Sequence, residues 1–125
     1  MSFDWPEYLN LARELAGQTT RPGNEEARLR SAISRAYYAA FITARNHLRD
    51  RESHQIPPDS QAHLYVQEQF RNSRNRVRKE MGRNLRRLRR LRNQADYIDR
   101  FPGLQITAAL ALQLAAQIIA RLGRL

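Results

Sequence analysis

The chain has 125 residues, no cysteine and a formal net charge of +10. This length suffices for one domain, residues 1–125, with a single hydrophobic core, and the lack of cysteine excludes disulfide bonds and thiolate metal sites. The positive charge favours an acidic partner, with nucleic acid first and an anionic membrane surface second.

Arginine carries almost all of this charge, because Lys79 is the only lysine among the 22 Lys and Arg residues. Arginine binds phosphate bidentately and stacks on bases, which suits nucleic acid, although genomic base composition can also favour arginine codons. His47, His54 and His63 are not spaced as metal ligands, so we expect no metal and no cofactor. Residues 1–10 lack the apolar run of a signal peptide, and we expect a cytoplasmic protein.

The first two predicted helices are separated by a turn. The first begins near Asp4, which can cap it, and ends near Gly17. Asn24 caps the second, which has about 27 residues and ends near Arg51. Its apolar residues recur at spacings of three and four and share one face: Leu29, Ile33, Ala36, Tyr37, Ala40, Ala44 and Leu48. We expect this to be the central helix of a small bundle.

A third helix, capped at residues 59–60, precedes a fourth that runs from about Arg76 to Arg100. The fourth carries an apolar stripe of Val77, Met81, Leu85, Leu88, Leu91, Ala95 and Ile98. Gly82 interrupts it, at a cost of about 1 kcal/mol relative to alanine. Either the helix begins nearer Asn84, or Gly82 permits a close backbone contact.

The last predicted helix is capped by Thr107 and runs through Leu122. All of its polar residues lie on one thin line, at positions 113, 117 and 121, so other helices must cover most of its surface. Burial in the bundle or between two copies is favoured over a membrane span, because the run is short and contains glutamine. The predicted class is all-α, an up-and-down bundle of four or five helices, with no membrane partner.

Residues 30–41, RSAISRAYYAAF, are the first candidate for a functional stretch. The small alanines let a neighbouring helix come close, while Arg35 and Tyr38 project polar groups from the other side. Two interpretations stay open. The tyrosines are core aromatics with satisfied hydroxyls, or Arg35 and Tyr38 face a binding site.

The second candidate is a run of basic residues in the fourth helix. Between positions 71 and 92 the basic residues are Arg71, Arg74, Arg76, Arg78, Lys79, Arg83, Arg86, Arg87, Arg89, Arg90 and Arg92, and the only acid is Glu80. Like charges on one helix repel one another. The run is therefore either a solvated face with counterions or a surface on which a bound anionic ligand reduces this repulsion. In the second case Arg86 and Arg89 contact RNA.

Arg92 and Asp96 are four residues apart and share a helical face. They form an exposed ion pair of little energy, or Asp96 orients Arg92 toward a phosphate. Asn93 can hydrogen-bond the same ligand, and Tyr97 follows directly after Asp96.

Three stretches taken together resemble the HEPN domain family, in particular its short stand-alone members that end in Arg-x-x-Ala-Asp-Tyr. They are residues 30–41, His63 and residues 92–97, RNQADY, and the likeness covers about residues 24–122. The resemblance implies a helical bundle that forms a homodimer, with a basic cleft between the two copies. It also implies a metal-independent endoribonuclease of the toxin or phage-defence type, often paired with a minimal nucleotidyltransferase antitoxin.

One departure from the family pattern bears on catalysis. The family signature is Arg, a polar residue, further positions and then His. Arg92 and Asn93 match its opening, but Tyr97 stands where the His would fall. Tyrosine, with a pKa near 10, is a poor general base, whereas histidine titrates near 6.5. The sequence does not show whether His63 reaches the site.

Three functions therefore stay open. The first is a ribonuclease with Arg92, Asp96 and Tyr97 as catalytic residues and with Arg35, Tyr38, Arg86, Arg89 and Asn93 binding RNA. The second is a non-catalytic protein that binds RNA or a nucleotide and partners a minimal nucleotidyltransferase. The third is a DNA-packaging role through the arginine helix alone.

Overall fold

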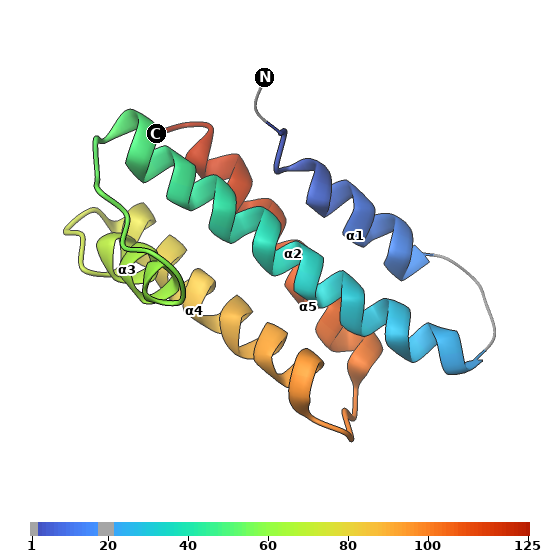
Figure 1. Ribbon diagram of the computed structural model, residues 1–125. Helices are drawn as coiled ribbons and strands as arrows, with labels where there is room; N and C mark the ends of the chain where they lie inside the picture. Colours follow the sequence, from blue (N-terminus) through green and yellow to red (C-terminus); the bar gives the residue numbers. More distant parts are fainter. Residues whose placement is uncertain (1–2, 18–21) are drawn as a thin grey trace.

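The computed structural model describes residues 3–17 and 22–125 and contains only helices among them. The five helices are α1 (Glu7–Gly17), α2 (Pro22–Arg51), α3 (Gln61–Arg71), α4 (Arg76–Tyr97) and α5 (Leu104–Leu122). Figure 1 shows α2 running through the centre of the bundle, with α1 and α4 along it and α5 behind. The packing agrees, since α2 contacts all four other helices while α3 packs chiefly on α4. The expected all-α bundle is confirmed.

The core is built around α2, as its periodicity predicted. Tyr37 and Ile33 are among the largest fully buried side chains of the protein. Five alanines of α2 are completely inaccessible to solvent: Ala32, Ala36, Ala39, Ala40 and Ala44. Because these side chains are small, α1, α4 and α5 approach the α2 backbone closely from several sides.

Four predicted helix ends were wrong. Helix α1 begins at Glu7, three residues after Asp4, which was expected to cap it. Helix α2 begins at Pro22, so Asn24 lies inside its first turn instead of capping it. Proline is well suited to a first helical turn because the missing N–H needs no partner there. The predicted turn before it includes Arg21, which lies outside the described residues.

Helix α5 begins at Leu104 and not at Thr107. The N-cap is Gly103, whose φ of 69° places it in the left-handed region that glycine adopts without strain. Thr107 instead donates its backbone N–H to the carbonyl of Gly103 at 3.0 Å, within the first turn. Residues with a side-chain hydroxyl are common N-caps, which is why Thr107 was expected, but the N-cap of α5 is a glycine.

Helix α4 ends at Tyr97, three residues before the predicted Arg100. Ile98 is already extended, with φ −90° and ψ 124°. Arg30 of α2 donates to the carbonyl oxygens of Ala95 at 2.9 Å and Asp99 at 3.0 Å, and so satisfies groups that the helix end leaves free. A side chain distant in sequence therefore fixes this helix end.

The start of α4 resolves the question of Gly82. Asn75 caps the helix, because its Oδ1 accepts the N–H of Arg78 at 3.0 Å. Gly82 lies inside the helix, and a Cβ there would overlap the backbone of Arg71 at the end of α3. Gly82 thus permits the close contact of α3 and α4.

The predicted apolar faces of α4 and α5 are only partly covered. Met81, Leu85, Leu88 and Ala95 are buried, but Val77 and Ile98 at the ends of the α4 stripe are 43% and 44% exposed. The expectation that α5 is covered on most sides is met in part within one protomer. Six of its 19 residues are buried, Ala108, Ala111, Leu114, Ala115, Ile118 and Leu122, and Leu104, Leu110, Leu112, Ala116 and Ile119 are partly buried against the core. Among the described residues, α5 is the one helix long and apolar enough to cross a membrane by length and composition. A core helix of a soluble protein passes the same test.

Candidate nucleic-acid site

Arg92 of α4 packs against two adjacent tyrosines of α2. Its guanidinium carbon lies 5.3 Å from the ring centroid of Tyr37 and 5.4 Å from that of Tyr38, within the range of cation–π attraction. One terminal nitrogen, Nη1, lies 3.5 Å from Asp96 Oδ2. The Arg92 side chain is 13% exposed, so the contact is a partly buried one and not a loose surface pair. Arg92, Asp96 and Tyr38, all named from the sequence, thus lie together.

His63 of α3 belongs to the same cluster. Its Nδ1 lies 2.5 Å from the hydroxyl oxygen of Tyr37. Its ring is stacked on Phe41, with the centroids 4.2 Å apart and the planes inclined by 13°. The sequence left the position of His63 open, and no spacing along the chain could have placed it, because residues 37, 63 and 92 meet only through the packing of α2, α3 and α4. We call Tyr37, Tyr38, His63, Arg89, Arg92 and Asp96 the Arg–His cluster.

Burial, together with two cationic neighbours, keeps His63 neutral. Burial, followed by the charges of Arg89 and Arg92, lowers the pKa of His63 from 6.5 to about 4. Burial raises the pKa of Tyr37 above its ordinary value, against the opposing effect of the same two arginines. At neutral pH the pair therefore consists of an uncharged imidazole and a protonated phenol.

A neutral imidazole with one hydrogen-bonded nitrogen has two possible tautomers. If Tyr37 donates to Nδ1, the proton of His63 is on Nε2, which is then a donor. If Nδ1–H donates to the Tyr37 oxygen, Nε2 has a free lone pair and is a base. The first arrangement binds a phosphate oxygen, and the second can accept a proton from a hydroxyl.

Arg89 belongs to the Arg–His cluster and also lines a small cavity between α3 and α4. The cavity has a volume of about 250 Å³ and is lined by Leu64, Gln67, Arg86, Arg89, Arg90 and Asn93. The structure thus brings three predicted RNA-binding residues together: Arg86, Arg89 and Asn93. The Nε atoms of Arg89 and Arg92 are buried and have no hydrogen-bond partner within the described part of the chain.

Two sequence-predicted residues lie outside the cluster within one protomer. Tyr97 is the last residue of α4 and is 77% exposed. Arg35 is half-buried on α2, and no hydrogen bond, ion pair or ring contact joins it to His63 or Arg92 in the described chain. Their predicted catalytic and binding roles remain predictions, because the cluster of one protomer does not include them.

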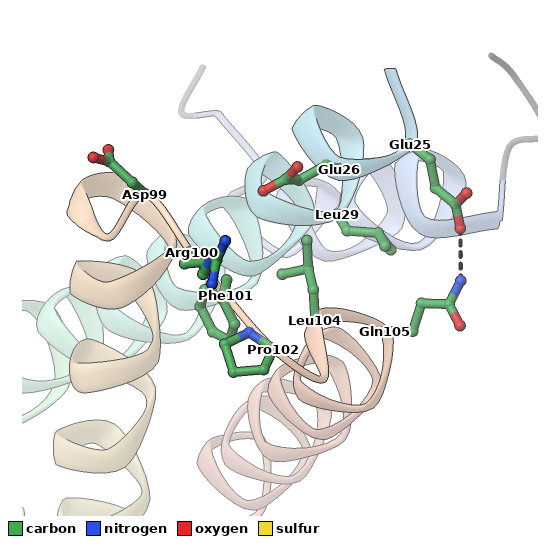
Figure 2. Close-up of a pocket in the computed structure, with 9 residues that line it drawn as sticks. All are labelled: Glu25, Glu26, Leu29, Asp99, Arg100, Phe101, Pro102, Leu104 and Gln105. Carbon is green, nitrogen blue, oxygen red and sulfur yellow. Dashed lines mark hydrogen bonds between the residues drawn. The ribbon is translucent and has the colours of Figure 1, made fainter. Parts of the chain in front are cut away.

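A different hollow, of about 700 Å³, lies where the start of α2 meets the α4–α5 turn. Figure 2 shows Glu25 and Glu26 on one side of it and Arg100 and Phe101 on another, with Asp99 at its edge pointing away and Glu25 accepting from Gln105 at 2.6 Å. Acidic residues outnumber Arg100 in its lining, and Glu26 is paired with Arg30 at 3.0 Å, so this hollow is less suited to a polyanion than the basic α4. The described residues contain no group of three or more His, Asp and Glu side chains placed to hold a metal ion.

Comparison with known proteins adds no information on the family or the function of the chain. The chain matches no protein-family model, and neither a curated protein sequence nor a solved structure is significantly similar to it. The likeness to the HEPN family therefore rests on the three sequence stretches described above.

Proposed function

We propose that the protein is a HEPN-type RNA-binding protein that holds a phosphodiester at the Arg–His cluster and cleaves it without a metal. One observation carries this proposal: the three stretches that resemble the family meet at one point. The first supplies Tyr37 and Tyr38, the second His63, and the third Arg92 and Asp96. Because the three stretches are far apart in sequence, their contact in the fold supports a shared site.

The electrostatics of the cluster support an anionic ligand. Burial and the charges of Arg89 and Arg92 lower the pKa of His63, which places both guanidinium groups near this ring. Asp96 offsets Arg92 in part, at 3.5 Å, and no ion pair involves Arg89 among the described residues. A phosphate between the two guanidinium groups accepts charge-assisted hydrogen bonds and relieves their repulsion.

The proposed reaction uses His63 as the base. Its lowered pKa keeps the ring unprotonated at neutral pH but makes it a weaker base than an ordinary imidazole. In the tautomer with Nδ1–H donating to Tyr37, Nε2 takes the proton of the RNA 2′-hydroxyl. The 2′-oxygen then attacks phosphorus, and the bond from phosphorus to the 5′-oxygen breaks after Arg92 has stabilised the charge on the phosphorane. The imidazolium of His63 returns this proton through a water molecule to the departing 5′-oxygen, which leaves a 2′,3′-cyclic phosphate, a 5′-hydroxyl and a neutral His63.

The second candidate function is binding without cleavage, as a partner of a minimal nucleotidyltransferase. Tyr37 favours it, because a phenol with a raised pKa keeps its proton and is a good donor to Nδ1. His63 Nε2–H then donates to a phosphate oxygen and cannot remove a proton. The two candidates differ in one proton position, which ¹⁵N NMR of the His63 ring distinguishes directly.

The test is incubation of the protein with tRNA and mRNA in EDTA. We expect cleavage products with cyclic phosphate ends from the wild type and none from a 2′-deoxy analogue. Arg92→Ala should abolish cleavage, while Arg124→Ala, an exposed charge near the C-terminus, should not. Binding without any turnover would favour the second candidate, and undiminished cleavage by Arg92→Ala would remove the Arg–His cluster from the reaction.

The proposal includes a homodimer. Tyr97 and Arg35 lie outside the Arg–His cluster of their own protomer, so a second copy is the natural source of these groups at each site. Two basic α4 helices facing one cleft would also concentrate positive charge for a polyanion. A solution mass of one protomer at the concentration where the protein is active would refute this part.

A further inference from the structure

A groove beside the Arg–His cluster has the size and chemistry of a nucleotide site. It lies between α2, the loop of residues 52–60 and the start of α3, and its volume is about 800 Å³. It is lined by Tyr38, Phe41, Ile42, Arg45, Arg49, His54, Gln55, Ile56, Pro57, Pro58, Asp59, Ala62 and His63. Small-molecule sites are typically apolar hollows of about 300–1,000 Å³ with a few polar groups.

The groove is continuous with the Arg–His cluster. Tyr38 and His63 line the groove and also belong to the cluster. The Tyr38 ring has Arg92 5.4 Å from its centroid, so Arg92 and the groove lie next to the same side chain. A polymer held by its phosphate at Arg92 therefore has the groove directly beside that phosphate.

The groove is basic at the end away from the cluster. Arg45 and Arg49 both line it and are one helical turn apart, and Asp59 is the only acidic residue among its lining residues. Arg49 is paired with its exposed neighbour Asp50 at 2.8 Å, so a phosphate in the groove shares Arg49 with that carboxylate while Arg45 provides the unpaired charge. Burial and the charge of Arg49 lower the pKa of Arg45. Arg45 spends two of its donors on the amide oxygen of Asn46, at 3.1 and 3.0 Å, and has no ion pair in the described chain.

The loop wall of the groove is held in place without a ligand. His54 Nδ1 lies 2.7 Å from the hydroxyl of Tyr65 on α3, which ties the loop to that helix. Ser53 and Asp59 near its two ends have φ values of 59° and 58°, a left-handed conformation that a non-glycine residue adopts only where its surroundings enforce it. Pro57 and Pro58 restrict the backbone between them.

We propose that this groove binds an unpaired nucleobase, with its flanking phosphate at Arg45 and Arg49. The apolar walls provide faces on which any base can stack, and the two arginines select a ligand that carries a phosphate. This inference rests on the proposed function for the phosphate at Arg92, since both phosphates belong to one RNA strand. A free mononucleotide carries the same chemistry, so the test must separate the two sources.

The first experiment uses the wild-type protein and ¹H–¹⁵N NMR. Adenosine 5′-monophosphate should perturb the amide signals of residues 54–62 more strongly than ribose 5-phosphate does, because the base occupies the groove. Equal perturbation by the two ligands, or none near the groove, would overturn the inference. Either result would leave the phosphate site at Arg92 untouched.

The second experiment scans a single-stranded RNA oligomer with one abasic nucleotide at successive positions. One position should weaken binding about tenfold, the effect of losing one stacked base. The double variant Arg45→Gln/Arg49→Gln should lose this position dependence, whereas the charge-matched control Arg51→Gln/Arg124→Gln should keep it. A flat profile for the wild type overturns groove binding by RNA, and if mononucleotide binding persists, the groove serves a free nucleotide instead.

The two proposals fail in different ways. If Arg92→Ala abolishes RNA binding but adenosine monophosphate still perturbs the groove, the groove site stands without the RNA function. If Arg92→Ala leaves RNA binding intact and the abasic profile persists, the Arg–His cluster is not the phosphate site and the groove alone holds the strand.

Discussion

The Tyr37 hydroxyl and His63 Nδ1 are 2.5 Å apart, although the two residues lie on different helices and are separated by 26 positions in sequence. The contact is partly buried and lies beside the guanidinium group of Arg92. It fixes the ring of His63, which also lines the groove, and leaves Nε2 as the ring nitrogen that does not bind Tyr37. The chemistry available to the cluster therefore depends on this single hydrogen bond.

Tyr37→Phe keeps the aromatic ring that packs against Arg92 and removes only the hydroxyl. Since one partly buried hydrogen bond is lost, we expect a decrease of about 1 kcal/mol in the free energy of unfolding. If the protein is a ribonuclease, kcat should fall at least tenfold with little change in KM, because His63 is no longer held in the tautomer that acts as a base. Steady-state cleavage of a fluorogenic RNA measures both constants. An unchanged kcat would show that the hydrogen bond has no part in catalysis.

The pKa of His63 makes stability depend on pH in a defined window. The folded chain protonates His63 near pH 4, whereas the unfolded chain does so near 6.5, so the unfolded state binds the extra proton between these values. The contribution of neutral His63 to the free energy of unfolding is complete above pH 6.5, and it is lost as the pH falls from 6.5 through 4. Urea unfolding from pH 7 to pH 4 should show a steeper loss of stability for the wild type than for His63→Gln.

A matched variant tests the cause of this shift. Arg89→Gln removes one of the two charges that lower the pKa of His63, so its folded pKa should rise toward 6.5 and the pH dependence should become weaker. The His63 ring signals, followed by NMR titration, report the pKa directly. A pKa that does not move in Arg89→Gln would mean that Arg89 has no part in the shift and that burial and Arg92 account for it.

The periodic parts of the fold could be predicted from sequence, and the parts that depend on distant contacts could not. Apolar spacing located all the helices, and the end of α2 at Arg51 agrees with the prediction. The end of α4 was misplaced because Arg30, far away in sequence, satisfies its last carbonyls. In the candidate site, Arg92 and Asp96 share a helix and were found together, whereas His63 depends on how α3 packs.

Gly82 provides a test of the α3–α4 packing on which the position of His63 depends. In an open helix, Gly→Ala stabilises by about 1 kcal/mol, but a Cβ at Gly82 would overlap the backbone of Arg71. We therefore expect Gly82→Ala to destabilise the protein by about 1–3 kcal/mol, in the range of overpacked cores. Gly17→Ala is the control, because nothing lies within 4 Å of a Cβ there. Equal effects of the two substitutions in thermal unfolding would argue against the close approach.

The salt dependence of RNA binding distinguishes a defined site from a basic surface. For single strands, each phosphate contact contributes about 0.7 to the slope of log K against log salt, so removing any exposed arginine that touches RNA lowers the slope by about that amount.

Arg92 should contribute to affinity through its planar group as well as through its charge. Arg92→Lys keeps the charge but loses the planar group that lies near both tyrosine rings, so we expect a nearly unchanged slope with at least a fivefold weaker affinity at every salt concentration. Arg83→Lys, at an exposed position on the same helix, is the matched control and should change neither quantity. If Arg92→Lys behaves like Arg83→Lys, the rings and Asp96 contribute nothing to recognition. The arginines of α4 would then act as an undifferentiated positive surface, as in a DNA-packaging role.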